Sequence, residues 1–144
     1  FRDNTKWCST VVSTTDTEWG GEKMYLLQNH APYISEKPSG EYISEDEAHY
    51  ICAIFNAPST EKYIQQSSDS RTYKIRPPIH VPEFDPTNDK HTQLAELSKD
   101  AHNNPERKGE IRDRINVIYL ELCGESKDDS TTSFQNDSLD NYIE

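Results

Sequence analysis

The sequence is poor in apolar side chains. The residues Ala, Val, Ile, Leu, Met, Phe, Trp, Tyr and Cys make up 32% of its 144 residues, against about 45–50% in an average soluble domain by a closely similar count. No apolar run approaches the roughly 18 residues that a membrane-spanning helix needs, so these residues contain no such helix. A net charge of −11 with so little apolar material is typical of disorder, but 10% aromatic residues and clean helical periodicity predict one folded domain.

Cysteine is also scarce. Cys8, Cys52 and Cys123 lie far apart, and no CxxC pair occurs. This argues against a zinc knuckle or a redox motif, and a secreted disulfide framework would leave one thiol unpaired, so we expect a protein of the reducing cytoplasm. Because the chain begins at Phe1 without Met or a signal peptide, we also expect it to be a piece of a longer protein.

Groups arranged for metal binding or catalysis are missing as well. His91 and His102 fall on one expected helix, but they are about three turns apart, which is too far for both to reach one ion. No GxSxG motif occurs, Gly20-Gly21 is too short for a phosphate cradle, and Cys52 lies on the apolar face of an expected helix. The sequence thus predicts no metal site, no cofactor site and no catalytic residue in this chain.

The other histidines and the paired acids are expected at the surface. His30, His49 and His80 have no partner at ligand spacing, so the histidines are predicted to be solvated or to cap helices. Acid pairs such as Glu45 and Glu47 are predicted to cap a helix or to lie on a solvated face.

The first forty residues have the composition of strands. A β-branched run at 7–14 predicts one strand, Gly20-Gly21 a turn, and residues 23–28 a second strand. Tyr33-Ile34 and Tyr42-Ile43 flank a Pro-Ser-Gly loop tip and are candidates for a hairpin.

The middle of the chain has stronger signals, and they are helical. Ser44 and Glu47 have the spacing of a capping box, in which the hydroxyl and the carboxylate both bind backbone N–H groups of the first turn. Apolar residues then recur with helical spacing, and the helix should end before Pro58. Its predicted apolar face consists of Ala48, Ile51, Cys52 and Phe55. A second, short helix is expected over residues 59–64.

The second half of the chain predicts an extended bridge and two more helices. The prolines in residues 77–82 predict an edge-like bridge. Turn residues at 85–89 open a helix over 91–102, and a helix from about 105 to 123 should stop at Gly124. The predicted apolar faces are Leu94, Leu97, Ser98 and Ala101 on the first, and Ile111, Ile115, Ile118, Tyr119 and Leu122 on the second. The expected fold class is α+β, with a small strand-rich N-terminal part followed by a helical part with an extended Pro-rich bridge.

The negative charge is unevenly distributed. Residues 124–144 carry −5 of the −11, and we expect them to form an acidic, flexible tail behind a domain over residues 1–123. Because phosphate binding depends on Lys and Arg, the overall acidity argues against broad nucleic-acid binding. Residues 70–82, however, hold two arginines and a lysine and no acid.

This basic segment is the best candidate for a nucleic-acid contact. Its cations alternate with an aromatic ring and hydroxyls on a backbone that should be extended over residues 71–76. Such groups bind phosphates, and an arginine can form a bidentate contact with guanine. From the residues alone, an ordinary exposed strand with salt bridges remains an open alternative.

Several short motifs within residues 47–102 resemble those of one protein family. They are residues 47–58, a helix with Tyr50 that ends in Phe55-Asn56-Ala57-Pro58, then Tyr63-Ile64, Ser70-Arg71-Thr72-Tyr73, the segment from Ile79 to Asp85, and a helix that opens with His91. In this order they resemble the C-terminal target-recognition region of N6-adenine DNA methyltransferases in restriction–modification systems, of the TaqI-like and type IIG kind. The usual turn of that family is Leu-Asn-Ser-Pro, from which Phe55 and Ala57 depart.

The resemblance implies a recognition domain for double-stranded DNA that is not catalytic in itself. The chain lacks an Asn-Pro-Pro-Tyr tetrad and a Gly-rich cofactor motif. The resemblance therefore implies a methyltransferase domain on the N-terminal side, with S-adenosylmethionine as its cofactor, in a parent protein that is a methyltransferase, a type II restriction endonuclease, or both. Such an enzyme rotates its target adenine out of the duplex while the recognition domain grips the DNA.

The predicted DNA-binding residues are chosen by charge and position within this resemblance. They are Arg71, Lys74 and Arg76 for phosphate or base contacts, assisted by Ser70, Thr72 and Tyr73, with Lys62, Gln65 and Gln66 on the same surface. Two rivals remain open: a protein-interaction module whose acidic surface docks a basic partner, and a purely structural C-terminal module without DNA contact.

Overall fold

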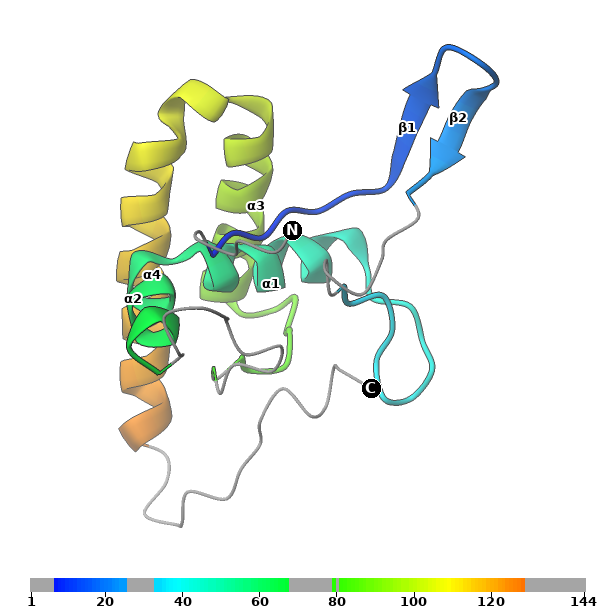
Figure 1. Cartoon of the computed structure of the whole chain (residues 1–144). Coiled ribbons are helices and arrows are strands. Elements are labelled where there is room, and N and C mark those ends of the chain that lie inside the picture. The colour runs from blue at the N-terminus through cyan, green and yellow to red at the C-terminus, as the bar shows by residue number, and fades with distance from the viewer. Residues whose placement is uncertain (1–6, 26–32, 68–78, 80, 129–144) are drawn as a thin grey trace.

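The molecule consists of a helical body from which a β-hairpin projects (Figure 1). The computed structural model describes residues 7–25, 33–67, 79 and 81–128. The elements are β1 (Thr14–Thr17), β2 (Gly21–Met24), α1 (Glu45–Asn56), α2 (Pro58–Ser67), α3 (Asp89–Asn103), the 3-10 turn η1 (Pro105–Arg107) and α4 (Lys108–Asp128). Since a small antiparallel sheet precedes the helices, the predicted α+β class is confirmed.

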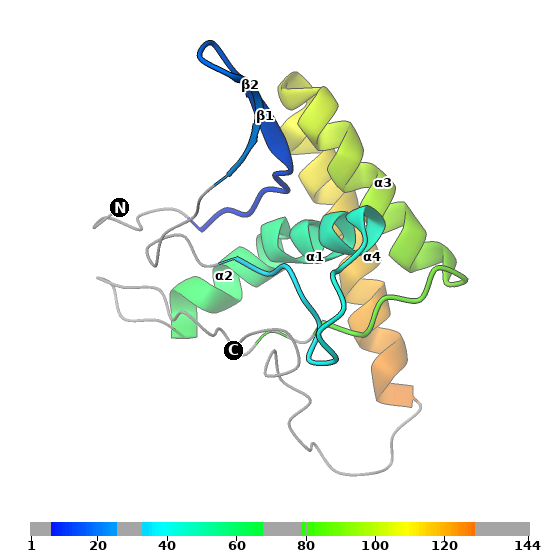
Figure 2. The same cartoon turned by 90° about the vertical axis from the view of Figure 1, so that its right-hand side faces the viewer.

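Helix α1 is the centre of the body. The helices α3 and α4, which η1 joins, lie side by side, and α1 crosses them (Figure 1, Figure 2). The sequence predicted one apolar face on α1, but Tyr50, Ala53 and Ile54 outside that face are also buried. The helix is buried on most sides because the N-terminal segment and the loop before α3 cover what α3 and α4 leave open. A helix in this position needs apolar residues beyond a single face.

One hydrophobic core joins all four helices. The apolar faces predicted for α3 and α4 are confirmed, with Leu94 and Ile111 fully buried. From α2 the core takes Ile64, and from the loop before α3 it takes Ile79. The buried members of this core are Tyr50, Ile51, Ala53, Ile54, Ala57, Ile64, Ile79, Leu94, Ala95, Leu97, Ile111, Ile115 and Tyr119.

The strand predicted over residues 7–14 is wrong except for Thr14, which begins β1. The chain before it is held by side chains of the body instead of by a neighbouring strand. Ser9 N–H donates to Asn56 Oδ1 at 3.0 Å, and Asn56 Nδ2 donates back to the Ser9 carbonyl at 2.8 Å. Trp7 Nε1 donates to the end of α1 at 2.7 Å. The amide of Asn56 thus takes the two bonds that a paired strand would have made.

The other strand predictions are only partly right. The second strand begins two residues earlier than predicted and ends at Met24. The chain does pair across the Pro-Ser-Gly tip as a hairpin would, but Tyr42 is bridged to Glu36, and the Ile43 N–H donates to the Ser35 carbonyl at 3.0 Å, so Tyr33-Ile34 are not the partners.

The helices agree better with the sequence, and the differences are at their ends. α2 extends three residues past the predicted end, and α4 continues through Gly124 to Asp128. A glycine ends a helix when it takes a positive φ, and among the described glycines only Gly21 and Gly40 do so. The predicted edge segment at 79–82 has no strand in its described residues; Ile79 is 4% exposed and packs into the core.

The predicted capping box at the start of α1 is only half formed. The Ser44 hydroxyl accepts the Glu47 N–H at 3.2 Å, as expected. The Glu47 carboxylate does not cap or lie in solvent; it is 2% exposed, and its Oε2 pairs with Lys37 Nζ at 3.2 Å. The Glu47 carboxylate departs from the prediction because of a tertiary contact: Lys37 comes from the loop that folds over the first turn of α1.

The remaining sequence predictions concern the cysteines and the membrane. Cys8, Cys52 and Cys123 are all free thiols. Cys52 is confirmed as a core residue, and burial raises the pKa of its thiol. No helix in the described ranges has the length and apolar character of a membrane span. The predicted extended segment at 71–76 and most of the predicted tail lie outside the described residues.

We expect Leu→Ala to lower the free energy of unfolding much more at a core position of α3 than at a surface position of α4. Leu94→Ala should lower the free energy of unfolding by about 2–5 kcal/mol, because it leaves a cavity at a fully buried position. Leu120→Ala, at a position 52% exposed, should lower it by less than about 0.5 kcal/mol. Urea unfolding followed by circular dichroism measures both, and an equal effect of the two substitutions would contradict the described core.

Candidate nucleic-acid interface

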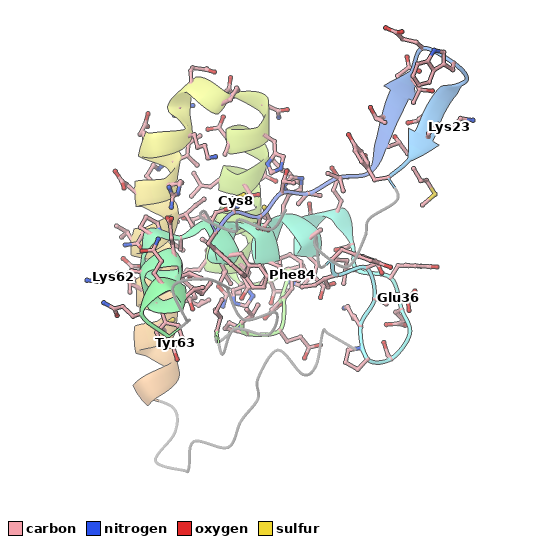
Figure 3. The ribbon with its side chains drawn as sticks, viewed as in Figure 1. Cys8, Lys23, Glu36, Lys62, Tyr63 and Phe84 are labelled. Carbon is pink, nitrogen blue, oxygen red and sulfur yellow. The ribbon has the colours of Figure 1, made fainter. Side chains whose placement is uncertain are left out.

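Of the charged residues predicted to bind DNA, only Lys62 belongs to the described part of the chain, together with Gln65 and Gln66 beside it. Its side chain is exposed on α2 and points away from the body, as does that of the neighbouring Tyr63 (Figure 3). The hairpin residue Lys23 lies on the opposite side of the molecule in the same view. The other predicted contacts, Ser70, Arg71, Thr72, Tyr73, Lys74 and Arg76, lie outside the described residues.

Helix α2 has one face in the core and one toward solvent. Ile64 is fully buried and Thr60 is 3% exposed, four residues before it on the same face. The opposite face is polar and aromatic, with Tyr63 47% exposed. Its exposed residues are Lys62, Tyr63, Gln65 and Gln66. The two glutamines expected on the same surface as Lys62 are therefore beside it.

Helix α4 holds α2 in this position. Arg112 Nη2 donates to Glu61 Oε2 at 2.6 Å, and Arg112 Nε donates to the Asn56 carbonyl at 3.0 Å. One turn further along α4, Asn116 Oδ1 accepts the Ser59 N–H at 2.9 Å. Sequence reasoning missed both positioning residues. Arg112 and Asn116 are four residues apart and lie beside the apolar stripe of α4, so they share one helix face. That spacing was the sequence signal that could have identified them as a pair.

The two ends of the basic segment are fixed by the body. The chain leaves the described region at the end of α2, shortly after buried Ile64, and returns at buried Ile79. Every residue between Ser67 and Ile79 is within six positions of one of these ends, and a chain spans at most about 3.3–3.6 Å per residue. The α-carbons of Arg71, Lys74 and Arg76 are at most five positions from one of these ends, which bounds their distance from it to about 18 Å.

Most described cations are already paired with carboxylates. The ion pairs are Lys37–Glu47, Lys90–Glu121, Lys99 with Asp46 and Glu96, Arg107 with Asp100 and Glu110, and Arg112–Glu61. Among the side chains that the structure describes, those of Lys23, Lys62, Lys108 and Arg114 form no ion pair. Lys62 is thus an uncompensated charge on the helix that leads into the basic segment.

The histidines are more structural than the sequence predicted. His91 is 5% exposed, and its Nδ1 accepts the backbone N–H of Asp85 at 2.9 Å. Its ring centroid lies 4.7 Å from that of Tyr50 and 6.2 Å from that of Phe84. The prediction of a solvated or capping histidine is therefore wrong here, because the rings of Tyr50 and Phe84 pack against the imidazole and the residue is buried.

His49 and His102 form a pair of neighbouring rings, and His102 binds the N-terminal segment to α3. His49 is 6% exposed, so its prediction was also wrong; its Nδ1 lies 3.0 Å from the Ser98 hydroxyl. The His102 ring packs edge-on against it, with 5.0 Å between centroids. His102 Nε2 accepts the Val11 N–H at 3.2 Å, and its Nδ1 donates to the Ser98 carbonyl at 2.7 Å. These bonds assign the proton to Nδ1.

The described residues contain no arrangement typical of an active site. No three His, Cys, Asp or Glu side chains among them are grouped as metal ligands. A surface hollow of about 400 Å³ lies between α3 and α4. It is lined by Thr92, Gln93, Glu96, Leu97, Asp100 and Arg114, and its two carboxylates are engaged in the ion pairs named above.

The described motifs behind the family resemblance are connected by direct contacts. The Tyr50 hydroxyl donates to the Pro82 carbonyl at 3.1 Å, and its ring packs against Phe84 and His91. Asn56, in the turn motif, holds the N-terminal segment. Comparisons of the chain with models of protein families, with curated proteins and with solved structures found no match. The resemblance therefore rests on the order of the motifs alone.

We expect the unfolding free energy to fall as the pH falls below 6.5. Burial lowers the pKa of His49 and of His91 from the ordinary value of 6.5, and the nearby His102 lowers that of His49 further. Below 6.5 the unfolded chain therefore binds more protons than the folded chain. The stability that the neutral rings contribute is fully present above pH 6.5 and is lost as the pH falls through the folded-state pKa values.

Urea unfolding between pH 7.5 and 5.5 measures this dependence. The variant His91→Gln should have a shallower dependence, because it removes one of the two titrating groups. If the wild type were equally stable across this range, the neutral, buried assignment of these rings would be wrong.

Proposed function

We propose that this chain is a DNA-binding domain. More particularly, we propose that it is the target-recognition domain of a restriction–modification N6-adenine DNA methyltransferase, and that it grips double-stranded DNA without performing chemistry itself. The catalytic domain, with S-adenosylmethionine, would then belong to the N-terminal part of the same longer protein, with or without an endonuclease.

One observation carries the proposal: the described family motifs build a scaffold that leads directly into the basic segment. Tyr50, Phe84 and His91 pack together at the middle of α1, and α2 starts beyond the turn at Asn56, where α1 ends. α2 then presents Lys62 on its outer face. Framework residues that pack and an exposed helix that leads into basic residues are what a recognition domain needs, since cations position the protein on the phosphate backbone.

The charge distribution supports a narrow contact with DNA. The chain has 26 acidic and 15 basic residues, so most of its surface repels phosphates. A single basic strip on such a protein restricts the orientations in which DNA can approach. It also makes binding by the isolated domain weak, so that the parent enzyme would supply much of the affinity.

The cellular compartment belongs to the same proposal. Restriction–modification enzymes act on DNA in the cytoplasm of the cells that carry them. The three free thiols support a cytoplasmic protein, because a reducing compartment keeps cysteines unpaired.

The triple substitution of Arg71, Lys74 and Arg76 by Ala should weaken DNA binding and reduce its salt dependence. For each phosphate that the variant no longer neutralises, the slope of log K against log salt should decrease in magnitude by about 0.9. The measurement is fluorescence anisotropy of a mixed-sequence duplex titrated with the full-length protein at several salt concentrations. An unchanged affinity together with an unchanged slope would refute the assignment of this segment to DNA.

Lys62→Ala tests the described part of the same surface. It should reduce the slope by the equivalent of one phosphate, or about 0.9. The matched control is Lys23→Ala, since Lys23 is also exposed and outside any ion pair among the described side chains but lies on the opposite side of the molecule (Figure 3). If both variants lowered the slope equally, the effect would reflect total charge and not a DNA contact at α2.

A further inference from the structure

The hairpin formed by β1 and β2 stands apart from the rest of the fold. Neither strand packs against any of the described helices, and the hairpin extends away from the body (Figure 1). An isolated two-stranded hairpin is at best marginally stable in water. It adds nothing to the described core, so a different role has to account for it.

The turn of the hairpin presents a tryptophan to solvent. Gly20 N–H donates to the Thr17 carbonyl at 3.4 Å, and Gly21 follows with a φ of 69°. That left-handed conformation has little steric cost only for glycine. Trp19 is thus at the tip, where it is 93% exposed. Leaving an indole in water is unfavourable, so its exposure at the end of a projecting arm is typical of a contact residue.

Other exposed apolar side chains gather on the same part of the chain. On the hairpin Met24 is 79% exposed, and the next residue, Tyr25, is 45% exposed. Of the nine large apolar residues found exposed in the described chain, six lie in its first 42 residues. These six are Val12, Trp19, Met24, Tyr25, Tyr33 and Tyr42.

The hairpin also carries a like-charge pair that its own fold does not neutralise. The register puts Asp16 directly opposite Glu22, and like charges at such positions destabilise a sheet. Within the described residues, the one hydrogen bond to either carboxylate comes from the hydroxyl of Thr14, which donates to Glu22. Alternation along the strands gives Met24 the same face as the two acids and Lys23 the other face. One face therefore has a thioether at the base of the hairpin and two uncompensated carboxylates nearer the turn, and the indole lies beyond them at the tip.

We propose that this hairpin is a docking arm for a protein surface that has an apolar pocket rimmed by lysine or arginine. Trp19 would fill the pocket, a cation of the rim would bind between Asp16 and Glu22, and Met24 at the base of the hairpin would extend the apolar contact. That cation relieves the repulsion across the strands. Tryptophan in a desolvated pocket and arginine beside it are the residue types that dominate binding energy at protein interfaces.

The charge of the hairpin favours a cationic protein surface as its partner over DNA or a second copy of the chain. DNA phosphates would be repelled by the carboxylates, and a second copy of the chain would bring the same acidic arm and a net charge of −11. The arm and Lys62 lie on opposite sides of the body (Figure 3). Docking of the arm is therefore compatible with DNA binding at α2 and does not depend on it.

Site-specific photo-crosslinking tests the arm in the full-length protein within the cells that make it. With p-benzoylphenylalanine at position 19, irradiation should join the arm to another polypeptide, or to another domain of its own chain. Mass spectrometry should map the adduct to an apolar pocket with Lys or Arg at its rim. Asp16→Lys combined with Glu22→Lys should lower the adduct yield at least tenfold, and Lys23→Ala, on the opposite face of the hairpin, should leave it unchanged.

A reciprocal charge swap completes the test. Changing the mapped rim cation to Glu should lower the yield with the wild-type arm and restore it with the double-Lys arm. An adduct to DNA, to the same arm of a second copy or to a surface without cations would overturn the proposal. So would an adduct yield no higher than that from the photoreactive residue at position 120. An unchanged helical circular dichroism spectrum verifies that the helical body of each variant is folded, and restoration of the yield by the charge swap verifies that the double-Lys arm can still dock.

Discussion

The C-terminal turn of α1 connects the parts of the molecule, and the connection runs through Asn56. Its side-chain amide binds the backbone of Ser9 in both directions and so holds the segment that leads to the hairpin. Its carbonyl accepts from Arg112 of α4, and the same guanidinium pairs with Glu61 of α2. Pro58 follows immediately and starts α2. The positions of the projecting arm and of the exposed helix α2 both depend on this one turn.

The two sides of the molecule differ in the charge that they expose. At α2 the exposed cation Lys62 leads toward the basic segment, and the arm on the opposite side carries carboxylates and exposed aromatic residues. A protein with such a division presents only one side to phosphates and leaves the other for a partner of opposite charge. In the proposed enzyme these would be the DNA and a neighbouring protein surface.

Local patterns in the sequence predicted the helices well and the strands poorly. Helical spacing, the Ser44 cap, Pro58 and the turn before Asp89 act within a few residues, and the structure agrees with them. The β-branched run before Thr14 predicted a strand, but its partner is a side chain of α1, which no local pattern can reveal. Of the candidate site, Lys62 was predictable from charge, whereas Arg112 and Asn116 contact α2 from more than fifty residues away.

The sequence by itself determined where helices start, which faces of α3 and α4 are buried, and where positive charge is concentrated, because periodicity, caps and charge are local properties. Only the tertiary structure decided that α1 is buried on most sides, that Glu47 pairs with Lys37 inside the protein, and that His49 and His91 are shielded from water. It also decided that the hairpin stands free of the described helices. Each of these depends on which distant segments pack against a residue. Tertiary packing, and not the neighbouring residues in the sequence, therefore sets burial and ion pairing.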